Sequence, residues 1–319
     1  MRALASPASL KGVLSPVEAA AALAAGMRRV EGLAVDEAPV ADGGEGTAEV
    51  LARSLGGAWR TVVVSDALGR PVEARYLVLP DGTAVVESAQ AVGLAALRQD
   101  ELDPLRASSR GVGELMVAAL GEGAARLLIC VGGTATVDGG AGMRAALGGA
   151  VAGVPIRVAC DVRNPLLGER GAARVFGPQK GATPEAVREL ERRLAADQEL
   201  GPYRDLPGAG AGGGLGAGLA ALGAELVPGA ELVLDAIGFD ERARGAALVV
   251  TGEGTVDATT LEGKAPGAVA ARCRALGVRC ELFGGLVRDG IPAHALSGRR
   301  ERAVDDLVGL GEELARALA

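Results

Sequence analysis

Short apolar runs alternate along the chain with stretches in which apolar residues recur every three or four positions. The runs are typical of buried strands and the longer stretches of helices packed on one face. This alternation predicts an α/β protein with a largely parallel sheet. The runs that we expect to form its strands cover residues 2–5, 34–40, 126–131, 155–160 and 247–251.

The first helix is predicted from its start signal as well as from its periodicity. Ser15 is a suitable N-cap, Pro16 suits the first turn, and Glu18 completes a capping box. An apolar face then follows at helical spacing, made of Val17, Ala20, Leu23, Ala24, Met27 and Val30.

The pattern changes between residues 61 and 87. Three strand-like runs, 61–65, 72–79 and 84–88, are separated by short turns. Consecutive strands with tight turns predict an antiparallel meander. We therefore expect two α/β domains: a discontinuous, parallel, Rossmann-like domain formed by 1–60 plus 240–319, and an inserted mixed-sheet domain formed by 61–239.

The amino-acid composition limits the kinds of catalytic and binding site that the chain can form. The chain has 319 residues with one His, three Lys and a net charge of −7. A multi-histidine metal site is excluded, and a histidine-dependent nucleophile would have to use His294. The acidic balance and six aromatic residues (Trp 1, Tyr 2, Phe 3) argue against nucleic-acid binding.

The cysteine spacing and the apolar runs of the sequence favour a reduced, cytoplasmic enzyme. The four Cys show no CxxC spacing, no apolar leader precedes Lys11, and the longest uncharged run, 208–224, is too rich in Gly for a membrane span. We expect no membrane partner and either a monomer or a homodimer.

Glycine-rich loops with acidic residues follow several predicted strands. Asp42 and Glu45 lie in ADGGEGT, Gly132 and Gly133 begin GGTATVDGG, and 252–257 reads GEGTVD. Ligands bind beyond the carboxyl ends of parallel strands, so we expect the loops after 126–131, 155–160 and 247–251 to converge. Each loop could hold Mg²⁺ or a substrate, and each could equally be a tight turn that caps the next helix.

All three lysines have a glycine neighbour. They occur as Lys11-Gly12, Lys180-Gly181 and Gly263-Lys264. Glycine lets the backbone approach a ligand closely, and an ammonium group suits phosphate or carboxylate. The alternative is three solvated lysines in surface turns.

Two glycine-rich nucleotide motifs fail. Gly208, Gly210 and Gly213 fit G-x-G-x-x-G but follow no strand, and Ala258 and Ala265 exclude a Walker A motif around Lys264. A different glycine-rich phosphate cradle stays open, and the alternative for 208–218 is a flexible or close-packed loop. We expect 183–196 to form a solvated amphipathic helix and His294 to be a surface or capping residue.

Six blocks together resemble the bacterial glycerate kinase family of type I, in family order and over nearly the whole chain to about residue 270. They are SLKG (9–12), PVADGGEGT (39–47), GGTATVDGGAGM (132–143), ACDVRNPLLGERGAARVFGPQKGAT (159–183), GAGAGGGLGAGL (208–219) and VTGEGTVDATTLEGKAPGAVA (250–270). The blocks 160–181 and 252–267 are long and specific.

The resemblance implies ATP-dependent phosphorylation of D-glycerate, with the active site in the cleft between two α/β domains. Phosphoryl transfer requires positioning and charge neutralisation and no histidine. By position in the family motifs, Asp42 or Asp161 would orient or deprotonate the hydroxyl, Lys11 and Lys264 would neutralise the phosphate or hold the carboxylate, and Glu253 or Asp257 would serve Mg²⁺ and the phosphates. The expected cofactor-binding residues are Gly132, Gly133, Thr134, Asn164, Gln179, Lys180, Gly212, Gly213 and Glu253, and Arg163 adds a further cation.

The chain departs from the family pattern at three places. Ala8, Val137 and Thr255 stand where the family usually has Asp, Asn and Arg, and the segment after Leu147 is shortened. A kinase of another small hydroxy acid, or a non-catalytic relative that binds nucleotide or acid, therefore remains an alternative.

Overall fold

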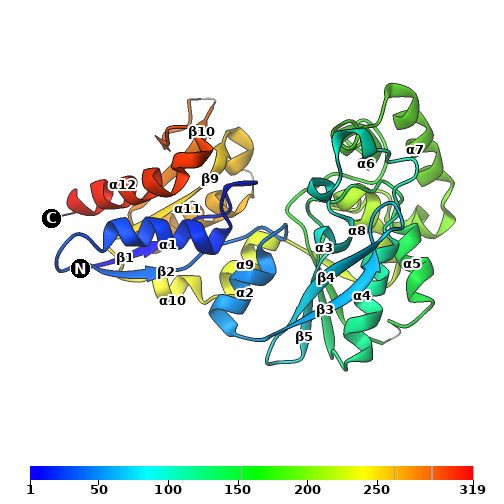
Figure 1. Ribbon diagram of the computed structural model, residues 1–319, viewed down its shortest axis with the longest axis horizontal. Coiled ribbons are helices and arrows are strands. Elements are labelled where there is room, and N and C mark those ends of the chain that lie inside the picture. The colour runs from blue at the N-terminus through cyan, green and yellow to red at the C-terminus, as the bar shows by residue number, and fades with distance from the viewer. Residues whose placement is uncertain (152, 262, 289, 319) are drawn as a thin grey trace. The chain divides into compact units, whose positions relative to one another are not determined.

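The computed structural model describes residues 1–151, 153–261, 263–288 and 290–318. The chain divides into two compact units (Figure 1). Unit 1 consists of Met1–Asp42, Glu49–Leu55 and Ala230–Ala319, and unit 2 of Gly43–Ala48 and Gly56–Gly229. The sequence alone placed the boundaries at 60/61 and 239/240. Each unit has its own sheet, and the α/β class is confirmed.

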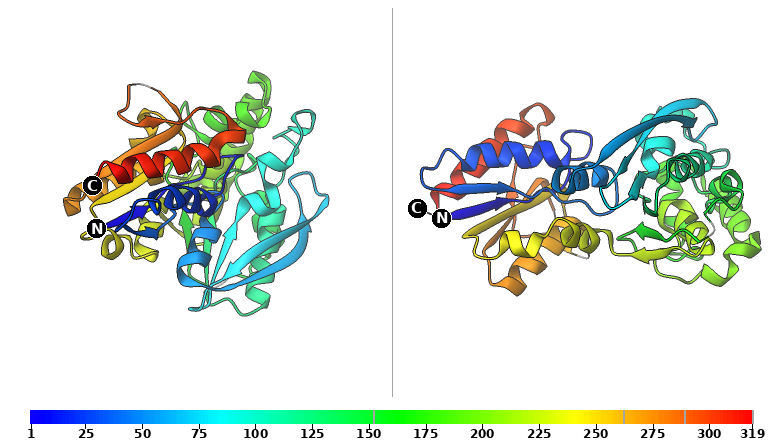
Figure 2. Two further views of the ribbon diagram at one scale, coloured as in Figure 1. Left: turned by 60° about the vertical axis from the view of Figure 1, so that its left-hand side comes forward. Right: turned by 90° about the horizontal axis from the view of Figure 1, so that it is seen from below.

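Unit 1 is built on a five-stranded sheet in the order β11-β10-β9-β1-β2, in which every pair is parallel. Helices cover both faces of this sheet, with α1 and α12 together on one and α10 and α11 on the other (Figure 2). The strands are β1 Arg2–Ala5, β2 Ala34–Glu37, β9 Leu248–Val256, β10 Cys280–Val287 and β11 His294–Ala295. The helices are α1 Pro16–Met27, α2 Thr47–Leu55, α9 Gly229–Ala236, α10 Phe239–Ala243, α11 Ala265–Leu276 and α12 Ala303–Arg316, with short 3-10 turns η5 Ala258–Leu261 and η6 Arg300–Arg302.

Helix α1 forms as its sequence predicts. The Ser15 side chain accepts from the Glu18 amide, and the Glu18 carboxylate accepts from the Ser15 amide. Its apolar face packs on α12 at very short range, because a Cβ atom on Gly26 would lie 1.9 Å from the Val308 carbonyl oxygen. Only a glycine lets the two helix backbones approach this closely.

Strand β9 is longer than the sequence suggested. The expectation that 252–257 is a loop is wrong as far as Val256, because β10 pairs with β9 through Gly284↔Glu253 and Val287↔Val256. Conversely, β2 ends at Glu37 and not at Val40. Strand pairing, which local sequence does not encode, sets both limits.

Unit 2 contains a six-stranded mixed sheet in the order β3-β4-β5-β6-β7-β8. The predicted meander is confirmed, since β3, β4 and β5 pair antiparallel. The next strands are parallel. The strands are β3 Ala58–Ser65, β4 Pro71–Val78, β5 Thr83–Glu87, β6 Arg126–Cys130, β7 Ile156–Ala159 and β8 Glu225–Val227. The helices are α3 Ser88–Val92, α4 Arg110–Gly121, α5 Ala141–Leu147, α6 Ala172–Phe176, α7 Pro184–Ala196 and α8 Ala211–Ala221, with 3-10 turns η1 Leu94–Ala96, η2 Gln99–Glu101, η3 Pro178–Lys180 and η4 Gln198–Tyr203.

The glycine-rich run near residue 210 is not simply a loop. Helix α8 covers 211–221, but Gly212, Gly213 and Gly214 have positive, non-helical φ inside it, so the loop interpretation is wrong only where the run becomes helical after Gly214. The close-packed alternative holds at Gly213, where a Cβ atom would lie 1.9 Å from the Thr136 carbonyl oxygen. Helix α7 with its N-cap Thr183 is confirmed. None of the helices among the described residues has the length and apolar character needed to cross a bilayer.

Candidate functional site

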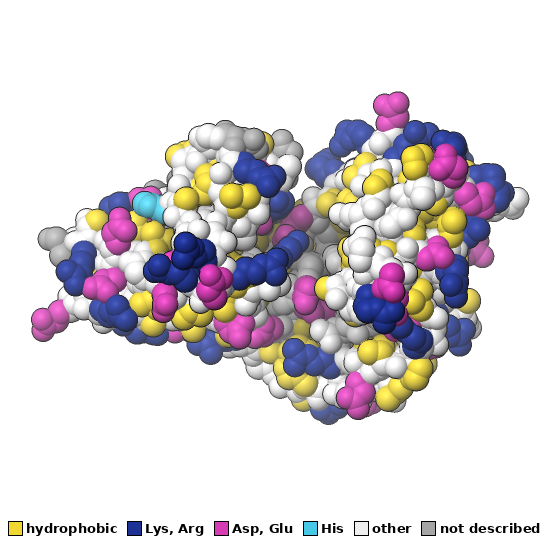
Figure 3. Space-filling view, turned by 45° about the horizontal axis from the view of Figure 1, so that its top comes forward, with side chains coloured by type: hydrophobic (Ala, Val, Ile, Leu, Met, Phe, Trp, Pro, Cys, Tyr) yellow, Lys and Arg dark blue, Asp and Glu magenta, His cyan; other side chains and the backbone are white. Residues whose placement is uncertain are grey.

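Side chains of both charges are interspersed on the face shown in Figure 3. A protein of net charge −7 that binds anions must therefore supply positive charge from individual, well-placed side chains.

In unit 1, Lys264 and two carboxylates meet at the carboxyl end of β9. Lys264 stands at the N-cap position of α11, and its Nζ lies 3.8 Å from Glu253 Oε1 and 3.8 Å from Asp257 Oδ1. The Thr260 hydroxyl donates to Glu253 Oε1 at 2.7 Å. One ammonium group is thus shared by two carboxylates, and sequence reasoning missed Thr260, which holds one of them.

The two carboxylates have different electrostatic environments. Burial raises the pKa of Glu253, against the lowering effect of the Thr260 hydrogen bond and the Lys264 charge, while the Asp42 charge raises it further. The Thr259 hydroxyl, 2.5 Å from Asp257 Oδ1, is the main cause that lowers the pKa of Asp257, and the Lys264 charge adds to it. Glu253 therefore depends most on nearby cations to stay ionised.

Lys11 is brought to the same place by the loop that follows β1. The Ser6 and Ala8 amides each donate at 2.8 Å to carbonyls of β9, at Val250 and Gly252. A Cβ atom on Gly254 would lie 3.4 Å from the Lys11 amide nitrogen, so the loop runs close along the strand. The Lys11 charge acts on Glu253 and lowers its pKa.

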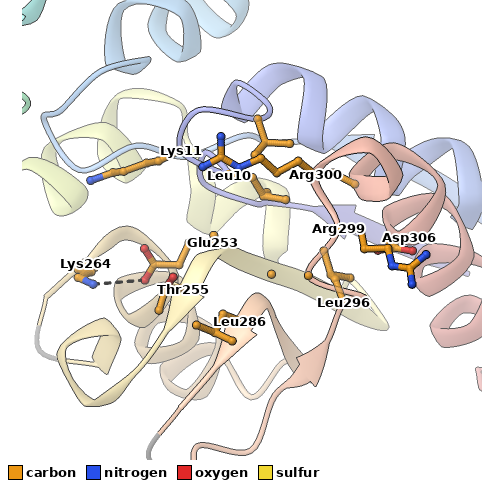
Figure 4. A pocket seen from close by; sticks show the side chains of 15 residues that line it. Leu10, Lys11, Glu253, Thr255, Lys264, Leu286, Leu296, Arg299, Arg300 and Asp306 are labelled. Atoms are coloured by element: carbon orange, nitrogen blue, oxygen red, sulfur yellow. Dashed lines mark ion pairs between the residues drawn. The ribbon is translucent and has the colours of Figure 1, made fainter. Parts of the chain in front are cut away.

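A cavity of about 430 Å³ opens beside this cluster. Figure 4 shows Lys11, Lys264 and Glu253 at one end of the cavity and Arg299 toward the other, with the Arg300 side chain extending toward Leu10 and Lys11. The remaining walls carry mostly apolar side chains and glycine backbone, with Thr255 and Asp306 as polar exceptions. The sequence motifs had included Leu10, Gly254 and Thr255 and none of the other residues of these walls. The walls are formed by Leu10, Val13, Gly254, Thr255, Gly285, Leu286, Leu296, Gly298, Ala303 and Asp306.

The position of this cavity follows from the topology of the sheet. From β1 the chain passes to β2 on one side, while β9 pairs with the other side of β1. The crevice beyond the carboxyl ends of two such strands is where open parallel sheets bind ligands. The loop after β1 and the end of β9 form this part of the cavity wall.

In unit 2, Lys180 is directed into the protein. It is 3% exposed, and its Nζ donates to the Thr136 carbonyl at 2.8 Å and to the Thr134 hydroxyl at 3.2 Å. Burial lowers the pKa of Lys180 to about 7, although the Asp138 charge opposes this. The Lys180 side chain thus holds the loop after β6 in place through these two hydrogen bonds.

Asp138 is engaged in the same loop. Its carboxylate accepts from the Ser109 amide and hydroxyl, both at 2.8 Å, and from the Gly140 and Gly142 amides at 3.1 Å. These bonds cap the start of α5. The alternative that GGTATVDGG is a capped strand-to-helix connection thus describes Asp138 well.

The other expected residues of unit 2 lie in varied surroundings. Asp161 Oδ1 accepts from the Gly229 amide at 2.7 Å, and Asn164 Nδ2 donates to the Arg170 carbonyl at 2.7 Å. Gln179 is exposed. Gly132 lies against Gly44, since a Cβ atom on Gly132 would be 2.7 Å from the Gly44 Cα atom. Gly133 is exposed, Gly212 is half-buried and Gly213 is buried.

The three loops that we expected to converge follow strands of two sheets. Strands β6 and β7 are neighbours in the sheet of unit 2, and β9 belongs to the sheet of unit 1. The convergence of the three loops stays a prediction.

The three departures from the family pattern fall in different environments. Thr255 lines the cavity of unit 1. Val137 is 2% exposed in an apolar cluster with Leu166 and Ala217. Ala8 contributes its amide to the bond with Gly252. His294, half-exposed on β11, pairs with Glu281 at 3.2 Å, away from these groups.

Comparison with known proteins identifies the family. The family model "Glycerate kinase family" matches residues 3–153 and 149–317. The chain is 42% identical to "Glycerate kinase" of Bacillus subtilis and 40% identical to "Glycerate 2-kinase" of Escherichia coli, in each case over 309 residues covering 85% of this chain and 81% of the relative. A crystal structure described as that of a glycerate kinase 2 from Salmonella typhimurium LT2 is 34% identical, with a TM-score of 0.83 over 100% of this chain and 98% of that one. The chain therefore belongs to the glycerate kinase family.

Proposed function

We propose that the protein transfers the terminal phosphoryl group of ATP to a hydroxyl of D-glycerate. The observation that carries the proposal is the group of Lys11, Lys264, Glu253 and Asp257 at the carboxyl ends of β1 and β9. Phosphoryl transfer is catalysed mainly by positioning and by neutralising charge, and this group supplies cations and carboxylates together.

Lys11 and Lys264 neutralise the charge that moves with the phosphoryl group. Lys264 reaches from the N-cap position of α11, a helix N-terminus that itself favours an anion. When the phosphate arrives, the Lys264 ammonium exchanges part of its contact with Glu253 and Asp257 for contact with phosphate oxygens.

Asp42 is our choice for the carboxylate that orients the attacking hydroxyl and accepts its proton. Its charge raises the pKa of Glu253, which supports a place within electrostatic reach of that carboxylate. Asp161, the alternative from sequence, already accepts a bond from the first amide of α9. We assign Asp161 to holding that helix start.

Glu253 and Asp257 have the donor chemistry for Mg²⁺. Magnesium sites in kinases use one or two carboxylates and complete their shell with water and phosphate oxygens. No three Asp, Glu, His or Cys side chains form a metal-binding group in the described ranges, but two carboxylates suffice for such a site. The Lys264 ammonium, 3.8 Å from an oxygen of each carboxylate, supports this choice, because the two carboxylates together favour a positive charge. Bound there, Mg²⁺ would neutralise phosphate charge.

We assign Thr134, Lys180 and Gly213 to shaping the loops of unit 2 and not to direct contact with ATP, because all three are buried. Gly133 and Gln179 are exposed, and they keep the role of contacts to substrate that sequence gave them.

The test is an assay that resolves the product. The purified protein with ATP, Mg²⁺ and D-glycerate should form ADP and phosphoglycerate, and the name of the Escherichia coli relative favours the 2-phosphate. Phosphorus NMR distinguishes the 2- from the 3-phosphate. ADP formation that does not depend on glycerate would overturn the proposal, and faster turnover of another hydroxy acid in the same assay would identify a kinase of altered substrate.

A further inference from the structure

We propose that the cavity of unit 1 binds the nucleoside triphosphate, with the base and ribose against Leu286 and Leu296 and the phosphates toward Lys11 and Lys264. This inference rests on the proposed function in one respect, namely that a nucleotide is one of the two substrates. Sequence reasoning had placed nucleotide contacts mainly on loops that the structure assigns to unit 2.

The size of the cavity matches a nucleotide better than the acid. Its volume of about 430 Å³ falls within the range of ~300–1,000 Å³ that is usual for pockets of ligands larger than a three-carbon acid. D-glycerate is short and polar throughout, so it would leave most of the cavity and all of its apolar wall in contact with water.

The apolar wall has a definite place in the cavity. Leu10 lies on one side, and Leu286 and Leu296 lie on the other (Figure 4). Leu286 is 46% exposed although it lies inside β10, directly after Gly284 and Gly285. An exposed leucine that borders a cavity offers the kind of surface on which a planar base is desolvated.

Glycines in the same wall leave it without side chains that would fill the cavity. A Cβ atom on Gly285 would lie 2.8 Å from the Gly254 carbonyl oxygen, and Gly298 also lines the cavity. Without side chains at these positions, a flat ligand can approach the backbone of β9 and β10, whose peptide groups offer hydrogen bonds to the edges of a base.

The charges set the direction in which the nucleotide lies. Lys11 and Lys264 lie at one end of the cavity and Arg299 at the other, while the Arg300 side chain extends toward the lysine end in the view of Figure 4. The lysine end also holds Glu253, whose pKa the Asp42 charge raises. The phosphoryl group must move beside the group that orients the hydroxyl, so the phosphates lie at the lysine end.

Two neutral substitutions test this arrangement, Leu286→Asn and Leu296→Asn, because they remove apolar contact without adding charge that would repel an anionic substrate. The matched control is Leu55→Asn, since Leu55 is 40% exposed, belongs to unit 1 and does not line the cavity. Each protein is titrated with ADP by calorimetry, and KM is measured for ATP and for D-glycerate.

We expect the dissociation constant for ADP and the KM for ATP to rise about tenfold in each cavity variant, which corresponds to ~1.4 kcal/mol. The KM for glycerate should stay within about twofold, and the control should match the wild type. Unchanged ADP affinity in both cavity variants would overturn the inference, as would a rise in the KM for glycerate alone.

Failure of the proposed function gives a different result. A wild-type protein that shows no glycerate-dependent turnover but binds ADP, with weaker binding in both cavity variants, would contradict the kinase assignment and support the nucleotide site. Glycerate-dependent turnover, together with ADP binding that neither substitution weakens, would support the kinase assignment and contradict the nucleotide site. Thermal unfolding of each variant checks that the substitution leaves the fold intact, which we expect for the exposed Leu286.

Discussion

The two units show that one sequence feature can have two physical meanings. Lysine next to glycine occurs in both, at Lys264 in unit 1 and at Lys180 in unit 2. Lys264 keeps a third of its side chain exposed beside two carboxylates, whereas Lys180 is buried and donates to a carbonyl and a hydroxyl. The first ammonium is available to a ligand, and the second is used by the protein itself.

The same contrast applies to glycines of positive φ. Gly12, beside Lys11, has φ +71° and open space around its Cβ position. Gly213 has φ +73°, but its Cβ position is filled by the Thr136 carbonyl. Four predictions follow the contrast from large effects to small.

The largest expected effect is on the stability of unit 2. Gly213→Ala places a methyl group 1.9 Å from the Thr136 carbonyl oxygen, which can move only if the loop after β6 moves with it. We therefore expect the free energy of unfolding to fall by more than ~3 kcal/mol, or the chain to fail to fold. Gly12→Ala, at nearly the same φ in open space, should cost only the strain of a left-handed residue, ~1–2 kcal/mol. Urea unfolding measures both. Equal losses for the two variants would contradict the distinction between close packing and backbone conformation.

The second effect is on catalysis by unit 1. Lys264→Met should lower kcat by about 10²–10³-fold, because it removes a cation aimed at developing phosphate charge. Its contacts with Glu253 and Asp257 are 3.8 Å long and partly exposed, so the melting temperature should change little. Lys264→Arg should recover part of the lost rate. A kcat within about threefold of wild type in the Met variant would place Lys264 outside the chemistry.

The third effect is on the pH dependence of stability. Folding lowers the pKa of Lys180 from an ordinary 10.5 to about 7, so between these values the unfolded chain holds a proton that the folded chain has released. This contribution to stability is smallest near pH 7 and grows with rising pH, by at most ~1.4 kcal/mol per pH unit. Lys180→Met removes the titrating group, so its loss of stability relative to wild type should increase from pH 7 to pH 9.5. Unfolding curves whose difference is independent of pH would show that the buried amine has an ordinary pKa.

The smallest effect concerns a surface pair of unit 2. Arg157 on β7 lies opposite Glu225 on β8 at 3.7 Å, with both side chains more than half exposed. Arg157→Ala should cost less than ~0.5 kcal/mol by urea unfolding, since water and salt screen such pairs. A larger cost would mean that the edge strand β8 depends on this pair for its register.

Local patterns predicted the α/β class, the meander, the capped helix α1 and the family blocks. Each of these depends on residues close in sequence, as Ser15 and Glu18 do. The length of β9, the helix within the glycine-rich run and the burial of Lys180 depend on partners far along the chain, such as Val287, Thr136 and Thr134. The apolar wall of the cavity was also missed, because Leu286 and Leu296 look like ordinary core residues in sequence.

The sheet order of unit 1 has a consequence for how the protein is made. Strand β1 is synthesised long before its neighbour β9, which begins only at Leu248, and α12, which packs on α1, follows later still. Almost all of unit 2 is synthesised between them as one continuous segment. Since domains fold as units during synthesis, unit 2 has all its strands before unit 1 can close its sheet. Helix α1 must therefore remain without its partner until α12 has been synthesised, and this interval is when the nascent chain needs most protection from aggregation.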